Sequence, residues 1–215
     1  MNRRNFIHTL LAAFTLLALP WAPRSPAADT TPVQVIEKFQ DTLLTVMKNA
    51  AKLGYQGRHK TLAPVVTTTL DLPTIARIAL GQYWGQLSAN QRTHFVATFT
   101  NLSVATYAAR FDGYDGETFT APTMRDLPGG DVLVQSALVK SNGGKVQFAY
   151  QMRKLDGQWR VINIIADGVS DLALKRAEYT SVIKNNNFDT LLDRLKQQTT
   201  AYERHGKDAK APTPA

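Results

Sequence analysis

The chain has 215 residues, of which 44 % are hydrophobic and 20 % charged, and this is enough apolar material for one ordinary folded domain. It carries 25 Lys and Arg against 17 Asp and Glu, a formal net charge of +8, and it has no cysteine. The lack of cysteine excludes disulfide frameworks, thiolate nucleophiles, Cys-ligated zinc and iron–sulfur clusters. With only four histidines as well, the composition favours a binding protein over an enzyme.

The first 27 residues have the three zones of a secretory signal peptide. Arg3 and Arg4 give a basic start, residues 6–19 are almost continuously apolar, and residues 25–27 offer small side chains for cleavage. The apolar run stops at Pro20 and is shorter than the roughly 20 residues that cross a bilayer, which favours cleavage over a membrane anchor. The paired arginines resemble a twin-arginine export motif and also suit general secretion. Either route predicts a periplasmic protein.

Cleavage after residue 27 removes three arginines and no acid, which lowers the formal charge from +8 to +5. The remaining basic residues are scattered and are not interleaved with aromatic residues, unlike those of a nucleic-acid-binding surface. We therefore expect no nucleic-acid partner, and only a mild, transient attraction to anionic lipid headgroups. No spacing of acids or histidines predicts a metal or a cofactor.

The first half of the exported chain is predicted to be helical. Thr31 and Pro32 are typical of a helix start, apolar residues then recur at three- and four-residue steps, and Gly54 is expected to end this helix. Ser88 and Gln91 form a capping-box pattern at the start of a long helix. The predicted helices cover about 31–54, 58–68, 71–81 and 88–109.

Short alternating runs separated by Gly and Pro follow residue 111 and predict antiparallel strands. Apolar and polar residues alternate most clearly over 146–152, and Asp156-Gly157 is typical of a two-residue hairpin turn. The predicted strands cover about 117–125, 131–140, 146–152 and 159–165. One face of the strand at 146–152 is wholly apolar, so we expect helices to cover it.

A helix or pair of helices is expected from about residue 170 to residue 198, and the polar residues 201–215 are expected to form a disordered tail. No repeat or linker divides the chain. We therefore predict an α+β fold with a signal peptide at 1–27 and one domain over 28–200. In this domain, N-terminal helices, a curved antiparallel sheet of about four strands and C-terminal helices enclose an apolar cavity.

Sequence patterns of enzymes are mostly missing. No glycine-rich phosphate loop and no nucleophile elbow occurs, and Asp112 and Asp115 lack the further ligands of a calcium loop. Asp167 follows an apolar strand, where it is either a buried general base or part of a turn before the last helices, and we favour the turn. What remains is a surplus of apolar and aromatic side chains, which either fill a core or line an apolar ligand site.

Several segments resemble, in order and spacing, one family. They are LDLPTIARIALG at 70–81 with Tyr83-Trp84, then 88–99, GQWRV at 157–161, DGVS at 167–170, Tyr179 and FDTLL at 188–192. The chain is similar in these segments to the MlaC/toluene-tolerance family of periplasmic phospholipid-binding proteins, over about residues 33–196. Within that family, LALKRAEY at 172–179 looks closer to the hopanoid-associated branch, HpnM.

The resemblance implies a soluble carrier that shuttles a lipid, phospholipid or hopanoid-type, between inner and outer membranes without any cofactor. Its implied partners are an inner-membrane ABC-transporter complex and an outer-membrane lipoprotein complex, and such systems maintain outer-membrane lipid asymmetry. Eight residues are predicted from their apolar faces to line the lipid cavity: Phe99, Leu102, Tyr107, Val134, Phe148, Tyr150, Trp159 and Val161.

Two other classes of function are compatible with the same pattern. The first is an enzyme with a nuclear-transport-factor-like cone of sheet and helices, which needs a carboxylate of raised pKa inside a pocket. The apolar face is expected to show Asn163 but no Asp or Glu, which counts against this class. The second is a structural adaptor in which the apolar face is simply a filled core.

Overall fold

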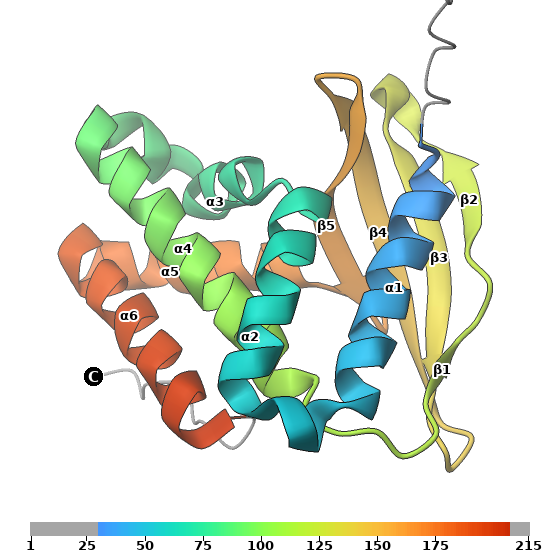
Figure 1. Ribbon diagram of the computed structural model, residues 1–215. Helices are drawn as coiled ribbons and strands as arrows, with labels where there is room; N and C mark the ends of the chain where they lie inside the picture. Colours follow the sequence, from blue (N-terminus) through green and yellow to red (C-terminus); the bar gives the residue numbers. More distant parts are fainter. Residues whose placement is uncertain (1–29, 207–215) are drawn as a thin grey trace, which may run out of the picture.

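The computed structural model describes residues 30–206, and within them six helices pack beside a six-stranded antiparallel sheet (Figure 1). The elements are α1 (Pro32–Lys48), α2 (Ala50–Thr69), α3 (Leu72–Leu80), η1 (Gly81–Gln86), α4 (Ala89–Arg110), β1 (Thr118–Phe119), β2 (Thr123–Asp126), η2 (Pro128–Gly130), β3 (Val132–Val139), β4 (Lys145–Leu155), β5 (Gln158–Ala166), β6 (Val169–Ser170), α5 (Asp171–Asn185) and α6 (Phe188–His205). The predicted α+β order of helices, sheet and helices is confirmed.

The sheet runs in the order β1-β3-β4-β5-β6, and β2 pairs with the same edge of β3 as β1 does. The single strand expected over 117–125 is therefore split in two, because residues 120–122 leave the sheet between β1 and β2. The sixth strand, β6, has two residues and leads directly into α5. In Figure 1, α1 lies across one face of the sheet, while the other helices extend away on the side of β5.

The helix starts follow their sequence signals, but one helix end does not. Thr31 with Gln34, and Ser88 with Gln91, form the reciprocal hydrogen bonds of a capping box. The first helix ends at Lys48 and not at Gly54, and α2 begins at once. Gly54 instead interrupts α2, with φ 57° and ψ −177°, a conformation that suits glycine because it has no Cβ. The predicted break at Gly54 is therefore present, but the prediction of one continuous helix up to it was wrong, because α1 already ends at Lys48.

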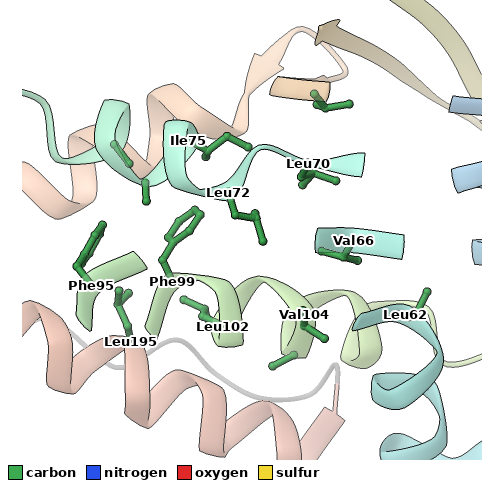
Figure 2. Packing of buried hydrophobic residues seen from close by; sticks show 14 of the residues in the cluster. Leu62, Val66, Leu70, Leu72, Ile75, Phe95, Phe99, Leu102, Val104 and Leu195 are labelled. Carbon is green, nitrogen blue, oxygen red and sulfur yellow. The ribbon is translucent and has the colours of Figure 1, made fainter. Parts of the chain in front are cut away.

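One apolar core is shared by the helices and the sheet, and its helical part is shown in Figure 2. Phe95 and Phe99 of α4 stack at 6.1 Å between ring centroids, and the Tyr179 ring of α5 meets both edge-on at 6.1 and 6.4 Å. Phe188 of α6 lies 6.0 Å from Phe95. We call Phe95, Phe99, Tyr179 and Phe188 the helical cluster. It joins α4, α5 and α6 into one body.

A β-bulge sets which side chains of β5 face the helices. Met152 of β4 pairs with Val161, whereas the preceding Gln151 pairs with Asn163, so Ile162 is the extra residue. Simple alternation from Val161 would place Asn163 on the apolar face. The bulge instead puts Ile164 there, opposite Tyr150, and Asn163 on the other face beside Gln151. The prediction of Asn163 on the apolar face was wrong for this reason.

The C-terminal helix is longer than the sequence predicted. Helix α6 continues to His205, and Tyr202 in its last turns is buried against the core, which gives residues 201–205 an apolar reason to stay helical. The predicted signal peptide at 1–27 and the rest of the predicted tail at 207–215 lie outside the described residues. Among residues 30–206, no helix is long and apolar enough to span a membrane.

Candidate apolar ligand site

Five of the eight predicted lining residues share one face of the sheet. Val134 lies opposite Tyr150 in the β3–β4 pairing, and Phe148 precedes Tyr150 by two residues, so all three project to the same side. Met152, two residues after Tyr150, pairs with Val161, and Trp159 lies two residues before Val161. We call this the inner face because α1 lies across it (Figure 1).

The inner face is buried at its middle and more accessible toward its ends. Along β4, Met152 is fully buried and Tyr150 is 3 % exposed, whereas Phe148 is only partly buried. The same change occurs along β3, from the buried Val134 to the partly buried Leu138. We call this end, where β3 ends and β4 begins, the open end. The opposite end carries the half-buried Trp159 and the exposed, charged Lys154.

Aromatic side chains from the helices meet the inner face at this open end. Tyr107 of α4 touches Phe39 of α1 edge-on at 5.5 Å and stacks on Phe111 at 5.7 Å. On the sheet side, Phe148 stacks on Tyr150 at 5.9 Å and lies 6.4 Å from Phe119. We call these six residues the apolar seam: Phe39, Tyr107, Phe111, Phe119, Phe148 and Tyr150.

The two tyrosines of the seam are neutral at physiological pH. Burial raises the pKa of the Tyr107 phenol, and the nearby Tyr150 adds to this effect. Burial also raises the pKa of Tyr150 to about 12, although hydrogen bonds from Gln40 and Ser136 act in the opposite direction. Both contribute aromatic surface and a neutral hydroxyl group.

The other predicted residues are less closely grouped. Phe99 and Leu102 project from α4 into the packing between helices, beside Leu72 of α3 (Figure 2). Trp159 lies at the opposite end of the inner face from Phe148, paired with Lys154 next to the β4–β5 turn. The structure thus brings Tyr107, Phe148 and Tyr150 together and leaves Phe99 in the helical cluster. Whether the eight residues line a lipid cavity stays a prediction.

Sequence reasoning missed a buried polar group on the inner face. Gln40 of α1 donates from Nε2 to Ser136 Oγ at 2.6 Å and to Tyr150 Oη at 3.4 Å. Gln40 and Ser136 are 3 % and 6 % exposed. The signal in the sequence was polar residues at positions where the helical and strand periodicities put apolar ones. We call Gln40, Ser136 and Tyr150 the polar trio.

Two surface hollows among residues 30–206 lie elsewhere and are lined mainly by polar residues. One, of about 420 Å³, lies at the β4–β5 turn, against the junction of α2 and α3, and is lined by Asp71, Leu155, Asp156, Gln158 and Arg160. The other lies on the outward face of α1. Neither is lined by a predicted cavity residue.

Acid–base chemistry has little support at the seam. Asp167 is exposed in the turn between β5 and β6, where its backbone has φ 48° and its Oδ1 accepts a hydrogen bond from the Gln147 amide at 2.8 Å. It is the turn residue that the sequence favoured, and not a buried general base. Within residues 30–206, no group of three or more His, Cys, Asp or Glu side chains is placed to hold a metal ion.

The fold is thus an α+β one, with helices on the apolar, aromatic inner face of an antiparallel sheet. Comparison with known proteins identifies the family. The sequence profile described as MlaC protein matches residues 37–197. The match covers about three quarters of the chain, and the chain therefore belongs to the MlaC family. The resemblance noted in the sequence is confirmed at this level.

Two curated relatives are similar over most of the chain. The intermembrane phospholipid transport system binding protein MlaC of Haemophilus influenzae is 22 % identical over 186 residues, covering 82 % of this chain and 86 % of that protein. The toluene tolerance protein ttg2D of Pseudomonas putida is 23 % identical over 194 residues, covering 86 % and 85 %. The alignments span nearly the whole of each relative.

A solved structure has the same fold. The phospholipid-binding protein from Ralstonia solanacearum, determined in complex with a phospholipid, superposes with a TM-score of 0.69 at 22 % sequence identity. The superposition covers 80 % of this chain and 98 % of that protein. The arrangement of helices around the sheet is thus shared with a protein that was crystallised with lipid.

Proposed function

We propose that this chain is a periplasmic carrier that holds the acyl chains of a phospholipid between its helices and the inner face of its sheet. The observation that carries the proposal is the apolar seam in a chain of the MlaC family. It is supported by the transport role named for the Haemophilus relative and by the phospholipid in the Ralstonia structure. Residues 1–27 would direct the chain to the periplasm and be removed there.

The energetics explain why such a carrier needs a seam and no catalytic group. Exposing two acyl chains of about sixteen carbons to water costs on the order of 25 kcal/mol, at about 0.8 kcal/mol per methylene. A protein interior about as apolar as a bilayer makes the transfer nearly balanced. The headgroup can remain in water at the open end of the inner face, where Phe148 is partly buried.

Lipid uptake requires the helices to separate from the sheet. Val134 is fully buried and Tyr150 nearly so, because Phe39 and Gln40 of α1 and Tyr107 of α4 lie close to this part of the inner face. Acyl chains reach Val134 only when these contacts give way. We propose that the chains then lie along Tyr107, Phe148, Tyr150, Val134 and Val161, with Phe99, Leu102 and Trp159 farther from the entrance.

The direction of transport would come from partners, because a carrier that binds lipid equally at both ends moves nothing by itself. We propose an inner-membrane ABC-transporter complex and an outer-membrane lipoprotein complex in these roles, with transient contact at each membrane. Residues 172–179 resemble the hopanoid-associated branch HpnM, so a hopanoid-type lipid is the finer alternative for the cargo.

The direct test is mass spectrometry of lipid extracted from the protein after purification from a periplasm without detergent. We expect close to one phospholipid molecule for each chain. Recovery of a polycyclic lipid in its place would assign the protein to the hopanoid branch. Repeated recovery of lipid-free protein that takes up no lipid from phospholipid vesicles would overturn the proposal.

A pair of matched variants connects this binding to the seam. Phe148→Asp places a charge among the aromatic rings and should lower the lipid recovered at least tenfold, because a carboxylate is costly to bury beside acyl chains. Leu174→Asp makes the same change at an exposed position on α5 and should leave lipid recovery unchanged. Equal recovery from both variants would place the lipid elsewhere on the protein.

A further inference from the structure

The polar trio is unusual because its surroundings are apolar. Its three side chains come from α1, β3 and β4 and meet between the helix and the inner face, next to Phe148 and near Tyr107. Buried polar groups cost free energy unless they are hydrogen-bonded, and an apolar core of the same shape avoids this cost. A purely apolar carrier would need only hydrophobic side chains here.

The two hydrogen bonds of the trio do not use the phenol proton of Tyr150. Gln40 Nε2 donates both of the bonds, at 2.6 Å to Ser136 Oγ and at 3.4 Å to Tyr150 Oη. Tyr150 Oη thus accepts from Gln40, and its own proton can be donated to another acceptor. The phenol stays protonated because its pKa is about 12.

The trio lies just inside the open end of the inner face. Tyr150 is two residues farther along β4 than the partly buried Phe148, a distance of about 7 Å along the strand. Ser136, which pairs with Phe148, marks the same level on β3. If the headgroup stays in water at this end, the linkage between glycerol and acyl chains lies at the depth of the trio, and the acyl chains continue toward Met152.

We propose that Tyr150 donates a hydrogen bond to an acyl-ester carbonyl of the bound phospholipid, with Gln40 and Ser136 as positioning residues that hold the phenol in place. This inference rests on the proposed carrier function. The carbonyl oxygen is a strong acceptor, whereas the matching position of an ether-linked lipid is a methylene that accepts no hydrogen bond. Tyr150 thus makes the carrier selective for ester-linked lipids.

The test is a competition between two lipids that differ only in this linkage. Wild-type protein is mixed with vesicles that hold equal amounts of a diacyl phosphatidylethanolamine and its dialkyl ether analogue of the same chain length. The protein is reisolated, and the ratio of bound lipids is measured by mass spectrometry. One neutral hydrogen bond corresponds to a preference of about 2- to 12-fold, so we expect the ester lipid in excess by about that factor.

Two phenylalanine variants isolate the phenol hydroxyl. Tyr150→Phe keeps the ring and should bring the ratio of ester to ether lipid close to one, while total lipid remains within about twofold of wild type. Tyr179→Phe removes a buried phenol in the helical cluster, away from the seam, and should leave the wild-type ratio unchanged. Ser136→Ala and Gln40→Leu should give intermediate ratios, because they loosen the phenol without removing its proton.

The outcomes separate this inference from the carrier function. If wild-type protein binds both lipids equally well, or if Tyr150→Phe retains the full ester preference, Tyr150 has no role in selectivity although the carrier function stands. If neither lipid is recovered from wild-type protein, the carrier function fails. The ratio of ester to ether lipid bound by wild-type protein tests the proposal even if a variant does not fold. Melting temperatures show which variants are folded.

Discussion

Two aromatic clusters of this molecule are built from the same side chains and differ in accessibility and polarity. The helical cluster is enclosed by α4, α5 and α6, and its Phe95, Phe99 and Tyr179 rings are almost fully buried. In the apolar seam, Phe148 and Tyr107 are partly buried, and the polar trio lies beside them. The comparison teaches that aromatic content alone does not mark a ligand site. Partial accessibility and a buried polar group distinguish the seam, which we propose as the ligand site, from the helical cluster.

The sharpest test of this comparison replaces one phenylalanine in each cluster. Phe99→Ala should lower the free energy of unfolding by about 3–5 kcal/mol, because a large, fully buried ring leaves a cavity. Phe148→Ala should cost less, about 1–3 kcal/mol, since its ring is already partly accessible. Urea denaturation gives both values. Lipid bound per folded molecule should fall strongly for Phe148→Ala and only slightly for Phe99→Ala, because Phe99 lies farther from the entrance.

The reverse pattern would break the comparison. If Phe99→Ala abolished lipid binding in protein that remains folded, the helical cluster would be part of the cavity, as the original list of eight residues predicts. The seam would then be only its entrance.

A smaller loss of stability is expected at the end of α3, where Gly81 has a backbone conformation that favours glycine. Gly81 has φ 55° and ψ −126°, and a Cβ there would lie 3.1 Å from Nε of Arg176 on α5. Gly81→Ala should therefore lower the free energy of unfolding by about 1–3 kcal/mol. Gly85→Ala is the control in the same segment, with no neighbour within 4 Å, and should be nearly neutral. Equal melting temperatures for the two variants would contradict the expected backbone strain.

The smallest expected loss of stability comes from an ion pair on the sheet, between Asp131 and Arg153, and it depends on pH. Asp131 accepts hydrogen bonds from Arg153 at 2.7 and 2.9 Å and from Gln151 at 2.9 Å. The Arg153 hydrogen bonds hold the pKa of the Asp131 carboxyl below its usual range. Asp131→Asn should cost about 1–2 kcal/mol at pH 7, a modest value because the Arg153 side chain is 44 % exposed.

The sign of the pH effect follows from the lowered pKa. A carboxyl that is more acidic in the folded state stabilises the fold fully above its unfolded pKa of about 4. This stabilisation is lost as the pH falls toward the folded value. The difference between wild type and Asp131→Asn should therefore shrink between pH 5 and pH 3 in urea denaturation. Asp126→Asn, at an exposed position on β2, serves as the control. A difference that stays constant down to pH 3 would rule out the ionic contribution.

Much of the fold was predictable because its signals are local. The capping boxes at Thr31 and Ser88, the hairpin turn at Asp156-Gly157 and the alternation over 146–152 all act within a few residues, and each appears in the structure. Gly54 shows the limit of such signals. A glycine that breaks a helix and one that ends it look alike in sequence, and only the packing of the following residues distinguishes them.

The site was less predictable because it depends on pairing between distant segments. The alternation of β5 correctly predicted Val161 on the inner face. Beyond the bulge at Ile162, however, Ile164 lies on the inner face in place of the predicted Asn163. Gln40 and Ser136 are 96 positions apart in the chain and meet only when α1 lies on β3. The periodicity of each segment marks its polar residue as buried, but neither periodicity shows that the two residues meet. The accessibility that separates the seam from the helical cluster likewise belongs to the folded molecule.

The edges of the sheet have a consequence for a protein that must expose apolar side chains to exchange its cargo. Open strand edges recruit strands from other molecules and lead to aggregation. One edge here is divided between the short β1 and β2, with Pro122 between them and the charged, exposed Arg125 and Asp126 on β2. At the other edge, β6 has two residues and turns into a helix. In the opening that we propose for lipid exchange, the sheet would therefore not become a template for strands of neighbouring molecules.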